Sequence, residues 1–337
     1  MASLSVLDQS PIRAGGTAVQ ALQETLQLAE ACDRLGYERY WLSEHHASRG
    51  LASAAPEILI GQVAARTRRI RVGSGGVMLM HYAPLKVAEQ FRMLEALYPG
   101  RIDLGIGRAP GSDRRTAMAL ATDPMESYDE FPARLEELHG FLADDLPDGH
   151  PFHGVRAMPD GVGLPELWML GSSKAGAEYA ARMGWRFAFA HFITPEGGED
   201  VVHAYRDSFQ PSPFLDHPVA MLAIGATVAE TVEEAERLAY SRWVWRLIRD
   251  RATFRGIPSP EDALSIALTD PEKDYIEYAR RASIYGPPDE VRHRLEATGR
   301  EYGTDDFMVV TITYDFAARV RSYELLAREF GLPGAAP

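Results

Sequence analysis

Four segments of the sequence place chemically useful side chains where an apolar, strand-like run ends. The first is Tyr-Trp-Leu-Ser-Glu-His-His at 40–46. A histidine that leaves a buried strand can donate a hydrogen bond or move a proton near neutral pH. We therefore predict a catalytic role for His45, whereas His46 is equally consistent with a structural contact in the loop. A metal site on the two histidines is the weaker interpretation, because local spacing supplies no further ligand.

The second segment is rich in glycine. Gly73, Gly75 and Gly76 lie inside one predicted strand, 70–79, where glycine is unfavourable. The residues alone leave two explanations open. The glycines could let a flat ligand approach the backbone at a bulge or an unusual peptide, or they could relieve crowding inside the sheet.

The third and fourth segments could bind an anion. Arg108 follows the run 101–107, and its planar guanidinium suits a phosphate, although a salt bridge at the rim would also explain it. Ser172 and Ser173 follow the run 166–170 and precede a helical pattern, so a capping role explains one of them. The free N–H groups of a helix N-terminus also attract anions. Because the arginine and the serines leave neighbouring predicted strands, we predict that they bind one phosphate together.

These segments need a scaffold that brings strand ends together. Residues 19, 22, 26 and 29 illustrate the helical patterns that separate the strands. Alternation of strand and helix leaves an open doubly wound sheet or a closed barrel, and eight strands without a break in composition favour an α/β fold of the (β/α)8 TIM-barrel type. The eight predicted strands are 3–7, 39–43, 70–79, 101–107, 166–170, 186–190, 219–226 and 307–313.

Two stretches interrupt the strand–helix repeat. Residues 109–165, after the fourth strand, contain one predicted helix at 125–143, and residues 253–288, after the seventh, carry five prolines. We interpret both as insertions that shape or cover a pocket. Tyr82, His191 and Phe192 are predicted pocket walls, and residues 284–286 are a further candidate. The barrel is expected to form one domain, 1–333, followed by a frayed tail, 334–337.

The composition restricts the partners of the protein. The 337 residues include 48 acidic and 35 basic side chains, a net charge of −13, which repels nucleic-acid backbones and anionic lipids. No apolar run is long enough to span a bilayer, and the N-terminal residues do not follow a secretory pattern. The single cysteine, Cys32, is predicted to be buried in a helix rather than nucleophilic. We therefore expect a cytoplasmic protein without nucleic-acid or membrane partners.

Taken together, the segments resemble the bacterial-luciferase-like flavin monooxygenase family, and most of all its single-subunit, short-chain-alkanal-type branch. The resemblance is carried by LSVLDQSP, YWLSEHH, VGSGGVMLMHYAPLKVAEQF, LYPGRIDLGIGRAPG, LGSS and MVVTITYDFAARVRSYELLAREFGL. These motifs run from residue 4 to residue 332. Their joint order is more specific than any one of them.

The resemblance implies a cofactor, partners and residue roles. The cofactor would be reduced FMN supplied by a separate flavin reductase, and it would react with dioxygen and a small organic substrate, such as an aldehyde. The resemblance places a non-proline cis peptide at Gly75–Gly76, beneath the flavin ring. It assigns the catalytic histidine to His45 and the phosphate contacts to Arg108, Ser172 and Ser173. It also implies a homodimer formed through the early barrel helices.

Two positions depart from the family pattern. Many relatives carry a hydroxyl residue where this chain has Gly176, which weakens the expected grip on the phosphate. The reactive cysteine of luciferase corresponds to Gly107, so light emission is not expected.

Three alternatives remain open. A deazaflavin (F420) enzyme would use the same scaffold to transfer hydride without oxygen. A second alternative is a non-catalytic flavin-binding barrel, for which Gly176 is the only supporting feature. A metal hydrolase built on His45 and His46 ranks last.

Overall fold

Eight parallel strands close into a ring in the computed structural model, which describes residues 2–108, 113–121, 129–249 and 256–335. The strands pair in the order β10-β1-β2-β3-β5-β6-β7-β8, and β8 pairs with β10 to complete the circle. The predicted (β/α)8 barrel is therefore confirmed. The ring strands are β1 (Ser3–Asp8), β2 (Arg39–Leu42), β3 (Arg71–Ser74), β5 (Ile102–Gly107), β6 (Glu166–Gly171), β7 (Arg186–Phe189), β8 (Ala220–Val228) and β10 (Asp306–Val310).

The third predicted strand, 70–79, is divided in two. Strand β3 ends at Ser74, and a short strand β4 (Val77–Met78) resumes after the peptide between Gly75 and Gly76, which is cis as expected. Both β3 and β4 pair with β5. The Ser74 hydroxyl donates to the Gly105 carbonyl at 2.9 Å and accepts from the Gly105 N–H at 3.0 Å, so a side chain replaces the ladder at the break.

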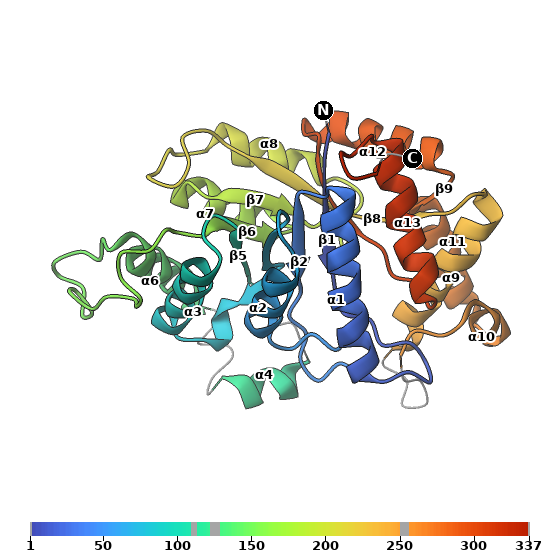
Figure 1. Ribbon diagram of the computed structural model, residues 1–337, viewed down its shortest axis with the longest axis horizontal. Helices are drawn as coiled ribbons and strands as arrows, with labels where there is room; N and C mark the ends of the chain where they lie inside the picture. Colours follow the sequence, from blue (N-terminus) through green and yellow to red (C-terminus); the bar gives the residue numbers. More distant parts are fainter. Residues whose placement is uncertain (1, 109–112, 122–128, 250–255, 336–337) are drawn as a thin grey trace.

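Helices surround the ring and follow the strands (Figure 1). Helix α1 begins at a capping box formed by Thr17 and Gln20 and ends at Gly36, whose φ of 90° favours glycine. The helices that flank the ring are α1 (Ala18–Leu35), α2 (Pro56–Arg66), the 3-10 turn η1 (Leu79–His81), α3 (Pro84–Leu97), α7 (Lys174–Met183), α8 (Glu199–Asp207), α9 (Val232–Ile248), α12 (Pro288–Tyr302) and α13 (Phe316–Glu329).

The two interrupting stretches contain more structure than the sequence predicted. After β5 lie α4 (Arg114–Leu120) and α6 (Phe131–Ala143). Helix α6 corresponds to the predicted helix 125–143, of which residues 125–128 lie outside the described chain. After α9 come α10 (Pro260–Ser265), α11 (Asp270–Ala282) and β9 (Ile284–Gly286). Strand β9 pairs with the end of β8 outside the ring. Helices α4 and α10 lie at the lower edge of the molecule, where the ring strands end (Figure 1).

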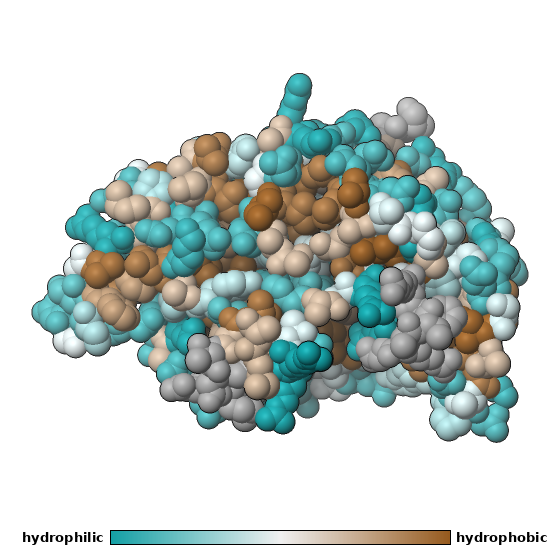
Figure 2. All heavy atoms as spheres, turned by 90° about the horizontal axis from the view of Figure 1, so that it is seen from below, coloured by the Kyte–Doolittle hydropathy of each residue, from teal (hydrophilic) through white to brown (hydrophobic). Residues whose placement is uncertain are grey.

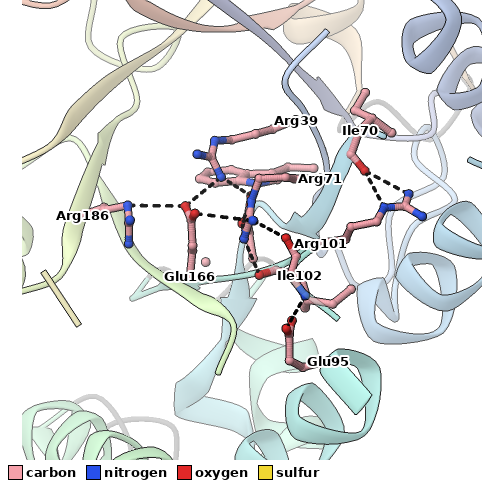
Figure 3. A network of polar contacts seen from close by, with 12 residues as sticks. Arg39, Ile70, Arg71, Glu95, Arg101, Ile102, Glu166 and Arg186 are labelled. Carbon is pink, nitrogen blue, oxygen red and sulfur yellow. Dashed lines mark hydrogen bonds and ion pairs between the residues drawn. The ribbon is translucent and has the colours of Figure 1, made fainter. Parts of the chain in front are cut away.

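The starts of five ring strands are joined by a charged network (Figure 3). Asp103 accepts from Arg39 at 2.9 Å and from Nε of Arg71 at 2.8 Å. Glu166 lies 2.9 Å from Arg39 and 3.4 Å from Arg186. This network closes the end of the barrel opposite α4, so the chemistry must lie at the other end.

A layer of tryptophan covers the network from inside the ring. Trp41 on β2 and Trp168 on β6 meet edge to face, with ring centroids 5.2 Å apart. Because β2 and β6 do not pair with each other, their side chains meet across the interior of the ring. The Arg39 guanidinium stacks 5.1 Å from the Trp168 ring, and Trp41 Nε1 donates to Asp103 at 2.8 Å. The half of the barrel next to the starts of the strands is thus filled by side chains.

Two further expectations concern single residues. Cys32 is fully buried on α1, and burial raises the pKa of its thiol, which agrees with a packing role. The prediction of a frayed tail does not hold for Gly334 and Ala335. The Gly334 N–H donates to the Leu35 carbonyl at 3.3 Å, and Ala335 is buried. Residues 336–337 lie outside the described chain. None of the described helices has the length and apolarity needed to cross a bilayer.

Candidate active site

A cavity of about 470 Å³ opens on the other side of the tryptophan layer, at the carboxyl ends of the ring strands. This volume is in the usual range for small-molecule and cofactor sites. Figure 2 looks onto this end of the molecule, and hydrophobic atoms are visible within a recess there. The cavity brings together seven of the predicted site residues, namely His45, Gly75, Gly76, Arg108, Ser172, Ser173 and Phe192.

A side chain on either residue of the glycine pair would collide with its neighbours, and at Gly76 the neighbour is backbone. A Cβ on Gly76 would lie 2.8 Å from the Gly105 carbonyl oxygen, and a Cβ on Gly75 would lie 2.6 Å from Cδ1 of Leu7. Crowding by the barrel therefore explains why these residues are glycine, and the same crowding leaves their backbone bare on the cavity side. The two explanations left open by the sequence are thus compatible with each other.

The opposite part of the cavity is polar. Arg108 follows the end of β5, and Ser172 and Ser173 lie between β6 and α7. Ser173 occupies the N-cap position of α7, but its side chain makes no capping hydrogen bond, so side-chain capping does not explain this serine. Its hydroxyl and the first N–H groups of the helix are therefore available to an anion beside the arginine.

Gly176 widens this polar part of the cavity. A Cβ at Gly176 would meet Gly171 Cα at 3.7 Å and Phe187 Cε2 at 3.8 Å, which are ordinary van der Waals contacts. Unlike Gly76, Gly176 is not required by packing.

His45 is held at the cavity by neighbouring loop residues. Ser43 Oγ lies 3.0 Å from His45 Nδ1, and the His45 backbone N–H donates to Ser53 O at 2.9 Å. Burial, with smaller contributions from the charges of Arg249 and His46, lowers the pKa of His45 to about 4. The ring is therefore neutral at physiological pH, with one N–H donor and one acceptor.

His46 and Tyr82 serve a different group, the buried carboxylate of Glu44. His46 Nε2 lies 2.6 Å from Glu44 Oε1, the Tyr82 hydroxyl donates to the same oxygen at 2.8 Å, and the Met78 N–H donates to Oε2 at 3.0 Å. Glu44 thus anchors β4 next to the glycine pair. The prediction of Tyr82 as a cavity wall is not met, because its side chain is directed to Glu44.

His191 also lies away from this cavity. Its ring packs 5.6 Å from Tyr302, and it lines a smaller neighbouring pocket of about 100 Å³. Burial lowers the pKa of His191 to about 4. Phe192 lines both pockets, and Ile284 lines only the smaller of the two. Residues 191 and 192 thus both line the smaller pocket, but only Phe192 also lines the larger cavity.

Sequence reasoning missed most of the apolar lining. These residues share a position near the ends of ring strands with the side chain directed inward, a signal that alternation within each strand carries only once the ring is known. They are Leu7, Trp41, Met78, Met169, Leu170, Ala188, Ala190, Ala223 and Met308. Gln9 adds a polar group. Within the described ranges no three His, Cys, Asp or Glu side chains are grouped as a metal site requires.

The geometry fits a flavin mononucleotide. The apolar walls and bare glycine backbone suit an aromatic ring system, and one arginine, two hydroxyls and a helix N-terminus suit a phosphate. Gly107 lines the same cavity. A Cβ at this position would lie 3.2 Å from Sδ of Met78.

Comparison with known proteins agrees with this geometry. A family model of luciferase-like monooxygenases matches residues 3–306. A luciferase-like monooxygenase of Escherichia coli (strain K12) is 40% identical over 324 residues, covering 96% of this chain and 95% of the relative. The N-acetyl-S-alkylcysteine monooxygenase of Bacillus subtilis (strain 168) is 38% identical over 328 residues, covering 97% and 98%.

Solved structures show the same architecture. The crystal structure of apo-MsnO8 matches with a TM-score of 0.87 at 40% identity, covering 98% of each chain. At 19% identity, the oxygenating constituent of 3,6-diketocamphane monooxygenase from Pseudomonas putida, in complex with FMN, matches with a TM-score of 0.68, covering 99% of this chain and 98% of that chain. An F420-dependent secondary alcohol dehydrogenase in complex with an F420–acetone adduct matches equally well at 15% identity, covering 100% and 99%. The last two show the fold alone.

Proposed function

The chain belongs to the luciferase-like monooxygenase family, and on that premise we propose that it is a flavin-dependent monooxygenase that uses reduced FMN, dioxygen and a small organic substrate. One observation carries the proposal. A single cavity joins a bare glycine backbone, an apolar wall, a neutral histidine and an anion-binding group of one arginine and two serines.

Each group has a defined task in this proposal. Arg108, Ser172 and Ser173 hold the phosphate, while Gly75 and Gly76 support the ring system. When bound, reduced FMN supplies two electrons to dioxygen, so that one oxygen atom enters the substrate and the other leaves as water. The apolar wall excludes bulk water from the reacting atoms.

His45 is assigned to proton handling. Its Nδ1 is in contact with Ser43, so Nε2 is the ring atom we assign to the reacting centre. Because the ring is neutral, it can hold one proton at a defined nitrogen throughout the physiological pH range. Ser43 fixes the orientation of the ring.

The phosphate assignment is tested by comparing FMN with riboflavin, which lacks the phosphate. Arg108→Gln is expected to weaken FMN binding at least tenfold, because a charge-assisted bond is lost, while riboflavin binding changes less than threefold. Arg156→Gln, on an exposed loop arginine outside the cavity, is the control. Equal loss for both flavins would refute the assignment, and tight binding of F420 alone would replace FMN as the cofactor.

Oxygenation is tested with a flavin reductase, NADH and an aldehyde series. We propose that such a reductase delivers the reduced flavin in the cell. Substrate-dependent oxygen consumption above the rate for free flavin is expected. Absence of oxygen consumption with bound flavin would favour a non-catalytic flavin-binding barrel.

We also propose a homodimer formed through α2 and α3. Ile58 on α2 and Met93 and Leu97 on α3 are 65%, 57% and 64% exposed, an apolar surface that a second copy would cover. Sedimentation is expected to give a dimer that Ile58→Glu with Leu97→Glu dissociates. A wild-type monomer at micromolar concentration would contradict this.

A further inference from the structure

A second cavity of about 680 Å³ adjoins the flavin cavity. The two share four lining residues, Gln9, His45, Phe192 and Ile193, so they meet beside the proposed catalytic histidine. A molecule in the second cavity would therefore reach the reacting centre past His45.

The lining of the second cavity is strongly basic although the chain is acidic. Arg49, Arg242, Arg246 and Arg249 line it, with Asp113 as the only carboxylate among its described lining residues. The chain as a whole has 48 acidic and 35 basic residues. Four arginines around one cavity thus contrast with the net negative charge of the chain.

Arg242 and Arg246 lie on α9, and Arg249 is the residue that caps its C-terminus. Residues 242, 246 and 249 are spaced four and three apart, which places them side by side on a helix. Like charges at this spacing repel one another, so the arrangement destabilises the free helix. Favourable interaction with the helix C-terminus explains Arg246 in the last turn and Arg249 at the C-cap, but not Arg242 one turn earlier.

Arg242 and Arg246 lack a carboxylate partner. Among the described residues neither forms an ion pair, whereas Arg237 on the same helix pairs with Glu234 at 2.9 Å and Glu261 at 2.8 Å. Burial, and secondarily the charge of Arg246, lower the pKa of Arg242 to about 10. Arg242 is therefore still charged at neutral pH, in a setting that disfavours the charge unless an anion is present.

A glycine makes room for this guanidinium. A Cβ on Gly225 of β8 would lie 2.8 Å from Nη1 of Arg242, so any larger residue would displace it from the strand end. Gly225 lines the smaller pocket of about 100 Å³, and Arg242 and Arg246 line both that pocket and the second cavity, so the Arg242 guanidinium lies against the end of β8 where the two spaces meet.

We propose that the arginines of this second cavity, Arg49, Arg242 and Arg246, bind the carboxylate or sulfonate of an organic-acid substrate, whose apolar part extends past Phe192 toward the flavin. The proposal rests on the oxygenase function proposed above. Leu51, Phe192 and Trp245 give the cavity an apolar side as well, which fits an amphipathic acid rather than an inorganic anion.

The test uses octanoate, octanesulfonate and octanol as probes of one chain length. Binding is measured by calorimetry on protein loaded with oxidised FMN. Either acid is expected to bind at least tenfold more tightly than octanol, since an arginine cluster at the edge of an apolar cavity selects an anionic head. Inorganic phosphate serves as a further probe, and phosphate binding as tightly as the acids would overturn the proposal.

The variants separate this site from the cofactor site. Arg242→Gln with Arg246→Gln is expected to remove the preference for the acids and to leave the FMN dissociation constant within threefold. Arg242→Lys is expected to restore part of the preference, and Arg237→Gln, on an ion-paired arginine of the same helix, is expected to preserve it. Thermal unfolding of each variant confirms that it is folded.

Two further results would overturn the proposal. One is equal binding of octanol and the acids to the wild type. The other is a loss of FMN affinity in the double variant as large as the loss of acid affinity, because the arginines would then hold the cofactor. Failure of FMN to bind the wild type would instead refute the proposed function, and the acid preference can still be measured on the flavin-free protein.

Discussion

A serine at position 176 is expected to strengthen flavin binding, and the structure gives the size of the effect. Gly176 is the third residue of α7, lines the cavity beside Ser172 and Ser173, and has room for a Cβ at 3.7 Å from Gly171 Cα. In Gly176→Ser the new hydroxyl would lie with the two existing ones at the helix N-terminus. It would add one hydrogen bond to a charged phosphate.

The magnitude follows from the hydrogen bond that is gained. A hydrogen bond to a charged group contributes about 1.5–3 kcal/mol after its exchange with water is taken into account. This gain corresponds to a roughly 10- to 150-fold lower dissociation constant for FMN. Riboflavin should show less than a twofold change, because it has no phosphate.

Gly176→Ala is the matched control for this prediction. Alanine fills the same Cβ position without a hydroxyl and removes the helix cost of glycine, so the free energy of unfolding should rise by about 1 kcal/mol. Its FMN affinity should stay within twofold of the wild type. Fluorescence titration of both variants with both flavins is the assay. If serine and alanine give the same FMN affinity, the phosphate does not lie at the start of α7.

Three further predictions concern Gly76, His45 and the buried carboxyl group of Asp306. Gly76→Ala should weaken FMN binding more than tenfold and lower the melting temperature, because its Cβ would lie 2.8 Å from a backbone oxygen that cannot move aside; unchanged values in calorimetry and titration would contradict this. His45→Gln should reduce coupled oxygenation about 10²- to 10⁴-fold with FMN affinity preserved. Since the pKa of His45 is about 4, the wild-type rate should show no titration of this group between pH 6 and 8, and an inflection there that His45→Gln removes would refute its neutral state. Burial raises the pKa of Asp306 to about 6, although the Arg39 charge opposes the shift. A raised pKa means that the carboxyl contributes most to stability at low pH and that the contribution is lost as pH rises through about 6. Asp306→Asn should therefore gain about 1–2 kcal/mol relative to the wild type between pH 4 and 8, and urea unfolding that shows no such pH-dependent difference would refute the reasoning.

Much of the scaffold was legible in the sequence. The apolar runs located all eight ring strands, and the strand–helix alternation indicated closure, because these patterns are repeated locally along the chain. The same reasoning placed His45, Gly75, Gly76, Arg108 and the two serines at strand ends, and parallel strands carry their carboxyl ends to one rim. Membership of one cavity then followed from ring closure.

The direction of side chains within the loops could not be predicted from the sequence. His191 and Phe192 are consecutive and both line the smaller pocket, yet only Phe192 also lines the cavity that contains His45. Tyr82 follows the 3-10 turn η1, which carries its hydroxyl to Glu44. Such directions depend on contacts with residues far away in the chain, so no local pattern reports them.

The arginine cluster shows most clearly which features the sequence determines and which depend on the tertiary structure. The spacing of residues 242, 246 and 249 on one helical face is a property of the sequence alone. That this face meets Arg49 from the loop after β2, across a cavity shared with His45, was decided by the tertiary structure. Local spacing fixes which side chains share a helix face, whereas closure of the ring and packing of the loops above it decide what that face meets.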